Sequence, residues 1–232
     1  ALIALFSSNW WRKARFAGNP DELVPRVVRA HFLYATILVL LQLVVGATIR
    51  HQHAGLAVWD FPKAHGQWWP STDAYSVAMY NQRRAELHKK LYDDHKVYDS
   101  EERPVIFLHS FRDIQPGHIT LHMGHRLIAF LILGLVLATV MLARKKLGGA
   151  HLLSRLALFW LGLVLVQVLL GALTVLKYKP ADIATMHVLF GSLTLMTGAL
   201  STVICGNLYL PAVNIESGEN SDVKITHAEA LG

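Results

Sequence analysis

The sequence predicts an all-α integral membrane protein: a four-helix bundle with a long extracytoplasmic loop between the first and second helices. Two observations predict this class. Of the 232 residues, 53% are hydrophobic and only 16% are charged, whereas an average soluble domain carries about 25% charged residues. The apolar residues also gather in four long blocks, and a chain in lipid satisfies its backbone polar groups within helices.

The four blocks define the expected helices, at residues 31–49, 119–143, 156–176 and 183–209. Each block is long enough to cross a hydrocarbon core about 30 Å thick at about 1.5 Å per residue. The first two helices weakly resemble the last two, so an internal repeat of two helical hairpins is one interpretation of the pattern.

The distribution of basic residues predicts on which side of the membrane the remaining segments lie. Basic residues precede the first helix and separate the second from the third, which predicts cytoplasmic termini in a bacterial inner membrane. The chain then divides into a cytoplasmic or interfacial segment (1–30), a membrane domain (31–210) with its outer loop (51–118), and a cytoplasmic tail (211–232). Within the loop, residues 73–99 mix aromatic and charged residues in a pattern compatible with one amphipathic helix.

The net charge of +6 indicates basic cytoplasmic loops and membrane lipid as the partner. Nucleic acid is not expected, because no RNA- or DNA-binding motif accompanies the charge. The single cysteine, Cys205, lies in an apolar block, which excludes an intrachain disulfide and a Cys-x-x-Cys site. Histidine is abundant, at 13 residues, and therefore directs the search for a functional site.

The second helix opens with His118, His122 and His125, whose spacings of four and three put them on one helical face. The fourth helix carries His187, and both helices enter from the outer side, so His125 and His187 are expected at similar depth. Ionisable residues in membranes usually face the bundle interior. Two imidazoles at matched depth suit the axial ligation of b-type haem iron, and hydrogen bonding between helices is the alternative.

Polar residues near this pair complete the candidate site. Arg126 and Arg50 are the candidates to pair with the haem propionates. His122 has two interpretations, a metal site or proton path on the one hand and a residue of the wet interface on the other. Gln42 and Gln167 lie within the first and third helices, where hydrogen bonds between helices are the default expectation.

The first part of the outer loop is rich in histidine and tryptophan. His51, His53 and His65 have two interpretations, a metal site in the loop or a solvated loop. We favour the solvated loop, since they show no tight spacing of metal ligands. The aromatic residues nearby suit the headgroup level of a membrane; they are Trp59, Phe61, Trp68 and Trp69.

These motifs, in this order, resemble haem A synthases. Residues 46–50 and 55–66 resemble the family's first outer loop, which follows an arginine at a helix end. The His125-Arg126 pair, residues 167–175 and the segment around His187 resemble the family's next three helices. The likeness extends over about residues 30–206.

The resemblance implies a membrane oxidoreductase that converts the C8 methyl group of haem O to the formyl group of haem A for cytochrome oxidase assembly. It implies that His125 and His187 ligate b-type haem, and that Arg50 and Asp60 belong to the outer lid of the site. His122 occupies the position of the family's catalytic acid and is the candidate catalytic residue. Imidazole can act as a base but cannot supply the negative charge of a carboxylate.

The sequence departs from the family pattern in its loop and its length. Val58 and Ala64 replace two loop cysteines, and one four-helix unit is present where many members have two. We therefore expect a homo-oligomer or a partner membrane subunit, with an electron donor that the sequence does not specify. Two alternatives stay open: a non-catalytic bis-histidine cytochrome b that transfers electrons or anchors a respiratory complex, and a haem-free membrane subunit.

Overall fold

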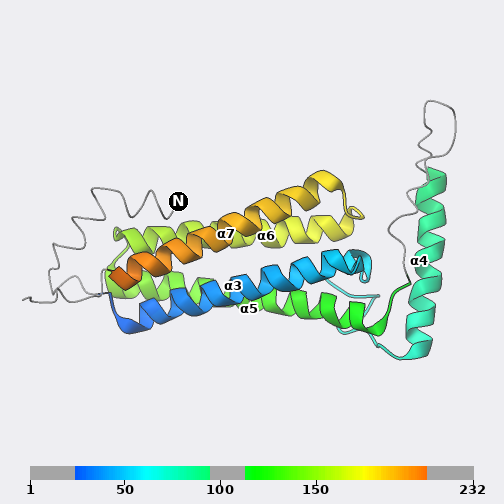
Figure 1. Ribbon diagram of the computed structural model, residues 1–232, viewed down its shortest axis with the longest axis horizontal. Helices are drawn as coiled ribbons and strands as arrows, with labels where there is room; N and C mark the ends of the chain where they lie inside the picture. The colour runs from blue at the N-terminus through cyan, green and yellow to red at the C-terminus, as the bar shows by residue number, and fades with distance from the viewer. Residues whose placement is uncertain (1–23, 95–112, 208–232) are drawn as a thin grey trace, which may run out of the picture. The chain divides into compact units, whose positions relative to one another are not determined.

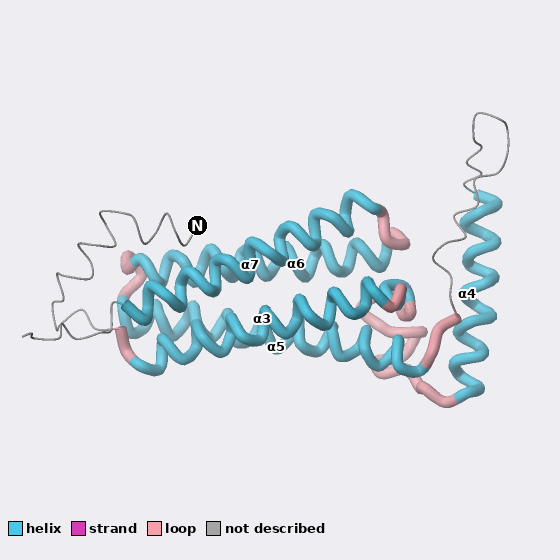
Figure 2. Tube along the Cα trace, viewed as in Figure 1, coloured by secondary structure: helices cyan, strands magenta, loops and turns pink. Residues whose placement is uncertain are grey.

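The computed structural model describes residues 24–94 and 113–207, and Val24–Gly206 form one compact unit. All regular secondary structure in these ranges is helical, which confirms the predicted class (Figure 2). The expected tail, residues 211–232, and most of the expected N-terminal segment lie outside the described residues.

Four helices are long and apolar enough to cross a membrane, as predicted. They are α3 (Arg26–His51), α5 (Pro116–Leu147), α6 (Leu152–Leu176) and α7 (Ala181–Asn207). All four begin earlier than expected, because their first turns contain polar or charged residues that a hydrophobic block does not reveal.

Local signals explain where the helices begin and end. Pro25 precedes α3, and Pro116 opens α5, where the absent proline N–H costs no helical hydrogen bond. The His151 ring accepts a hydrogen bond from the backbone N–H of Leu153 and caps the start of α6. Gly148 ends α5 with φ +84°, a conformation that suits glycine.

The long helices form two hairpins, α3 with α5 and α6 with α7, which lie side by side in Figure 1. α5 also packs against α6, and the hydroxyl groups of Thr36 on α3 and Thr202 on α7 lie 3.1 Å apart. We call the end at which α3 stops and α5 starts the loop end, and the opposite end the far end.

The far end is closely packed around Trp160. This side chain is fully buried, stacks on Phe32 with centroids 5.9 Å apart, and donates from Nε1 to the Thr194 carbonyl at 2.9 Å. A Cβ atom on Gly198 would lie only 2.5 Å from the Trp160 ring. Glycine is therefore required where the two hairpins meet.

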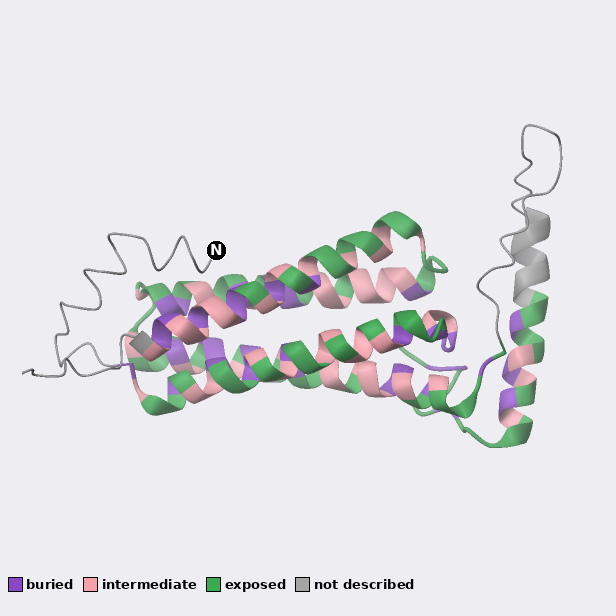
Figure 3. Cartoon of the chain, viewed as in Figure 1, coloured by how far each residue is buried: buried purple, intermediate pink, exposed green. Residues whose placement is uncertain are grey.

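The loop end is packed less closely. Residues 171–174 of α6 and His187 of α7 are half-buried, although they lie within the bundle. In Figure 3 the buried positions of α3 and α7 concentrate toward the far end, and half-buried and exposed positions dominate elsewhere. The candidate histidines thus belong to the looser half of the bundle.

The long loop begins with a 3-10 helix, η2 (Ala54–Leu56), which contacts both α3 and α5. The loop then packs on the first turns of α5 through a small apolar core. Its members are Ala57, Val58, Ala64, Val77, Tyr80, Ile114, Ile119 and Met123. This core holds the loop against the helix that carries His122 and His125.

The amphipathic helix expected at residues 73–99 is present as α4 (Ala74–Asp94). Asp73 precedes it and accepts hydrogen bonds from the Ser71 hydroxyl, the Ser76 hydroxyl and the Ser76 backbone N–H. These bonds, first that from Ser71, hold the pKa of the Asp73 carboxyl well below its usual range. The Asn81 side chain pairs with both backbone groups of Ile114, at 2.7 and 3.1 Å, which joins α4 to the start of α5.

The four aromatic residues of the loop divide into two pairs. Trp68 and Trp69 are 74% and 59% exposed, and their expected position at the headgroup level stays a prediction. Trp59 is partly buried and packs on the loop core, and Phe61 lies beneath the Arg126 guanidinium. The second pair therefore stabilises the loop.

The α6–α7 turn is short and strained. Its backbone N–H groups at Lys177, Tyr178 and Lys179 donate to carbonyls of the last turns of α6. Tyr178 and Lys179 have φ values of 57° and 64°, and each such residue costs about 1–2 kcal/mol when it is not glycine. The turn brings the Lys179 side chain over Gly55 of η2, so it contacts the other hairpin.

Candidate functional site

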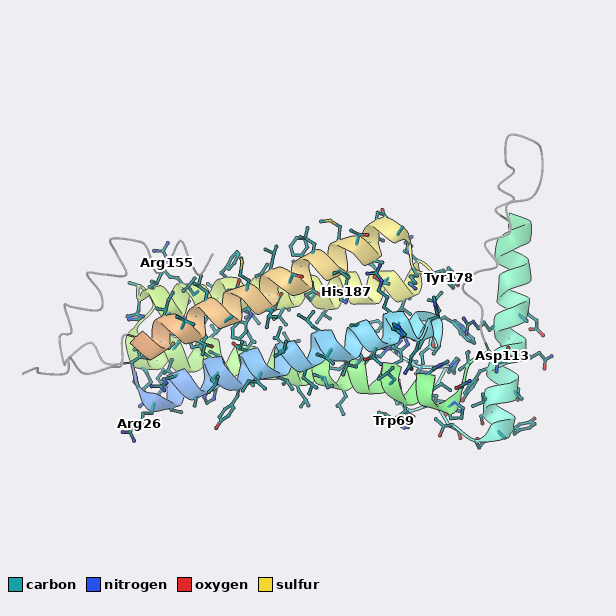
Figure 4. All side chains as sticks on the ribbon, viewed as in Figure 1. Arg26, Trp69, Asp113, Arg155, Tyr178 and His187 are labelled. Carbon is teal, nitrogen blue, oxygen red and sulfur yellow. The ribbon has the colours of Figure 1, made fainter. Side chains whose placement is uncertain are left out.

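The structure brings His125 of α5 and His187 of α7 together in the loop-end half of the bundle. Their side chains lie close enough for their charges to interact, and both rings are half-buried. Each Nδ1 atom is buried and has no hydrogen-bond partner among the described residues. Figure 4 shows His187 on α7, with Tyr178 marking the turn at the loop end.

In the first hairpin, α3 supports His125 at two points. The Gln42 side-chain amide donates to the His125 backbone carbonyl at 3.0 Å. One turn further along α3, Gly46 faces the imidazole, and a Cβ atom there would lie 3.2 Å from Cε1. The absence of a side chain at Gly46 therefore leaves room for the ring.

In the second hairpin, α6 supports His187 in the same manner. The Gln167 side-chain amide donates to the His187 carbonyl at 2.8 Å. One turn later Gly171 faces the ring, and a Cβ atom there would lie 3.3 Å from Cε1. The repeat interpreted from the sequence is thus present as a repeated set of contacts.

Gln42 and Gln167 bond between helices, as expected, but the sequence does not reveal that each donates to the carbonyl of a candidate ligand. Nor does it reveal that a glycine one turn later faces each histidine ring. The available signal was the spacing Gln-x-x-x-Gly, which occurs in both first helices of the hairpins. Only the paired contacts show that this spacing belongs to histidine support.

His122 lies one turn before His125 and is 6% exposed. Its Nδ1 atom is buried without a partner among the described residues, and its ring is near enough to His65 and Arg126 to interact electrostatically. The interpretation of His122 as a residue of the wet interface therefore receives no support from its burial.

The interpretation of His65 as a solvated loop residue is wrong. His65 is 9% exposed, stacks on Tyr80 at 3.8 Å between centroids, and meets Trp59 edge-on at 4.4 Å. Its Nε2 donates to the Ala57 carbonyl at 2.9 Å, because a carbonyl can only accept. Burial lowers the pKa of His65, so its Nδ1 carries a buried lone pair without a described partner.

Arg126 fastens the loop to α5. Its two terminal nitrogens donate to the carbonyls of Asp60 at 2.7 Å and Lys63 at 3.0 Å. The Asp60 carboxylate in turn accepts from the backbone N–H groups of His65 and Gly66, at 2.7 and 2.8 Å. The structure therefore places Arg126 and Asp60 in one loop-holding network beside the histidines.

The remaining candidate, Arg50, is exposed at the end of α3. It lines a cavity of about 560 Å³ together with Ala47, His51 and His53. A second cavity of about 660 Å³ lies between the end of α3 and the start of α5, and His118 is among its lining residues. These openings lie at the loop end.

The donor set fits haem better than a bare metal ion. Within the described ranges, no group of three or more His, Cys, Asp or Glu side chains could hold a metal. The paired histidines instead offer one imidazole from each hairpin, each beside a glycine and each with a buried, unpartnered nitrogen. Two neutral imidazoles with small residues beside them would suit a haem held by two histidines.

The sequence model of COX15-CtaA, described as cytochrome oxidase assembly protein, matches residues 1–199. The chain belongs to this family. This membership confirms the resemblance to haem A synthases that the sequence motifs indicated.

One curated relative is the Heme A synthase of Beijerinckia indica subsp. indica. It is 26% identical to the chain over 188 residues, which cover 80% of this chain and 44% of the relative. The chain thus spans less than half the length of that curated relative. No solved structure matches the chain.

Proposed function

We propose that this protein is a haem A synthase-like oxidoreductase that oxidises the C8 methyl group of haem O to the formyl group of haem A. The observation that carries the proposal is the pair of histidines, one in each hairpin, each with a buried and unpartnered Nδ1. Membership of a cytochrome oxidase assembly family supports it.

In this proposal, His125 and His187 hold a b-type haem between the two hairpins. Haem iron supplies the oxidising chemistry that side chains lack. Gln42 and Gln167 fix the two ligand-bearing segments through their carbonyls, at 3.0 and 2.8 Å. Trp160 closes the bundle at the far end, so the proposed haem is reached from the loop end.

His122 is proposed as the catalytic residue. Conversion of a methyl to a formyl group removes four electrons, which must pass to an external electron acceptor, and with water as the source of oxygen it releases four protons. A neutral imidazole with a free Nδ1 lone pair can accept one of them. The His122 ring lies one turn from His125 and is buried without a described Nδ1 partner. It thus has the position and the open nitrogen that such a base requires.

Arg126 and Arg50 are proposed as partners of the haem propionates. Arg126 uses two donors on the loop carbonyls, and a guanidinium offers five N–H donors in all. Arg50 is exposed at the mouth of the bundle and lines one of its cavities. Both can therefore reach a carboxylate without breaking a contact seen in the structure.

The proposed assembly has a second four-helix unit, from a second copy of this chain or a partner membrane subunit. The length of the curated synthase motivates it, since the match covers only 44% of that relative. The proposed setting is a bacterial inner membrane with both termini in the cytoplasm, as the basic segments indicate.

The test is to express the protein with haem O supplied, record a reduced-minus-oxidised spectrum, and identify the extracted haem. Haem A or hydroxylated haem O, absent when His122 is replaced by alanine, supports the proposal. Haem B alone identifies a cytochrome b, and a colourless folded protein contradicts haem binding altogether.

A further inference from the structure

Lys179 has an unfavourable backbone conformation that surrounding contacts must hold in place. Both Tyr178 and Lys179 have positive φ, in a region that residues with a Cβ atom rarely adopt. The Lys179 backbone N–H donates to the Thr174 carbonyl at 2.7 Å, which holds the turn in this form. Such strain persists where the surroundings over-determine it, and it often marks a functional position.

The repeat of the two hairpins locates Lys179. α3 ends at His51, five residues after Gly46, and α6 ends at Leu176, five residues after Gly171. By this register Lys179 corresponds to Ala54, the first residue of η2. Its Cδ, Cε and Nζ atoms each lie 3.8 Å from the place of a Cβ on the adjacent Gly55.

This contact lies between the two hairpins. Lys179 belongs to the α6–α7 turn and Gly55 to the loop that follows α3, so the lysine side chain crosses from one hairpin to the other at the loop end. His125 and His187 also come from different hairpins, in the same half of the bundle.

The charge of Lys179 is not balanced within the described part of the chain. No described carboxylate forms an ion pair with its ammonium group, and the side chain is exposed. Arg126 and Arg50, the proposed partners of the propionates, both belong to the first hairpin, whereas Lys179 lies in the turn of the second. A cation over the mouth of the site is thus available to an anionic ligand.

We infer that the Lys179 ammonium binds a carboxylate of the tetrapyrrole held between His125 and His187, and so joins the two hairpins over the bound group. The inference rests on the proposed function, because it requires haem between these histidines. Within α7 the chain rises roughly 9 Å from Ala181 to His187, at about 1.5 Å per residue. The lysine side chain and a propionate arm together can bridge that rise.

The carboxylate is identified by chemistry. A porphyrin has an apolar body with two acidic arms, and a compact ammonium group at the edge of an apolar site pairs with such arms as a point charge. The Cδ, Cε and Nζ atoms of Lys179 lie at ordinary van der Waals distance, 3.8 Å, from the place of a Cβ on Gly55, so the lysine side chain packs against η2.

The experiment titrates haem b into haem-free protein in detergent and follows the Soret band, in parallel with haem b dimethyl ester, which lacks the acidic groups. The variants are Lys179→Met, Lys179→Arg and, as a matched control, Lys177→Met in the same turn. We expect Lys179→Met to bind haem b roughly tenfold more weakly, the effect of one charge-assisted hydrogen bond. Lys179→Arg and Lys177→Met should bind it within about twofold of wild type.

The ester separates this inference from the proposed function. Wild type and Lys179→Met should bind the ester equally, because neither can pair a cation with it. If wild type binds haem b but Lys179→Met binds it as tightly, the inference is overturned and the proposed function stands. If wild type gives no Soret shift with haem b, both are overturned.

Discussion

The α3–α5 hairpin and the α6–α7 hairpin hold their histidines alike and differ in what connects their helices. In both, a glutamine bonds the histidine carbonyl and a glycine one turn later faces the ring. Residues 52–115 connect the first pair of helices, whereas residues 177–180 connect the second.

This difference distinguishes the residues that support the histidines from the residues proposed for other chemistry. Ligand support occurs in both hairpins, so it is a property of the repeated unit. The buried groups His65 and His122 and the Arg126 network occur only in the first hairpin and its loop. The residues proposed for chemistry beyond ligation therefore belong to one half of the bundle, and the other half contributes the second proposed ligand and Lys179.

The largest effect is expected from removing either histidine. His125→Ala and His187→Ala should each lower haem affinity by more than about 100-fold, since outer-shell changes alone cost 10- to 100-fold. Absorbance spectra of the purified variants measure this, with His31→Ala at the far end of α3 as control. If either variant keeps the spectrum of a haem with two histidine ligands, the prediction that each hairpin contributes one ligand is wrong.

Filling the two glycines is the next test. Gly46→Ala and Gly171→Ala put a Cβ atom 3.2 and 3.3 Å from the histidine Cε1 atoms, so each ring must shift by a few tenths of an ångström. We expect haem binding to weaken about tenfold in both, because displaced ligands lose geometry. Haem titration is the measurement, and Gly124→Ala, which meets no atom within 4 Å, is the control. An effect in only one hairpin would show that the two supports are unequal.

Removing the glutamines should produce smaller and unequal effects. A neutral hydrogen bond contributes about 1 kcal/mol to the free energy of unfolding. Gln42 also has a buried Oε1 atom with no described partner, and Gln42→Ala removes that unfavourable group. Gln167→Ala should therefore lower the free energy of unfolding more than Gln42→Ala does. Thermal unfolding of the haem-free variants measures this difference. The reverse order would contradict the contacts at Gln42.

The smallest effect is a pH dependence confined to the loop of the first hairpin. Because burial lowers the pKa of His65 below 6.5, the unfolded loop binds a proton more readily than the folded loop. Loop stability should be complete above pH 6.5 and decrease as the pH falls below that value. Hydrogen exchange of residues 57–67 measures it, and His65→Gln should remove the dependence while the α6–α7 turn stays unchanged. A loop equally protected at pH 5 and pH 7 would contradict it.

The four helices were predictable because hydrocarbon thickness demands long apolar runs. His125 and His187 were predictable as a pair because helix rise puts them at equal depth. The burial of His65 was not, since it depends on Tyr80, which follows fifteen residues later and returns to stack on it. Helix starts were also missed, because proline and histidine caps rather than apolar residues determine them.

The way Arg126 holds the loop has a consequence for the missing cysteines. Its acceptors are main-chain carbonyls, which no substitution of a side chain removes. Val58 and Ala64 are fully buried methyl-bearing residues in the loop core. A loop tied by carbonyls and by packed methyl groups contains no bond that thiols can reduce, so its shape is independent of the redox state of the compartment it faces.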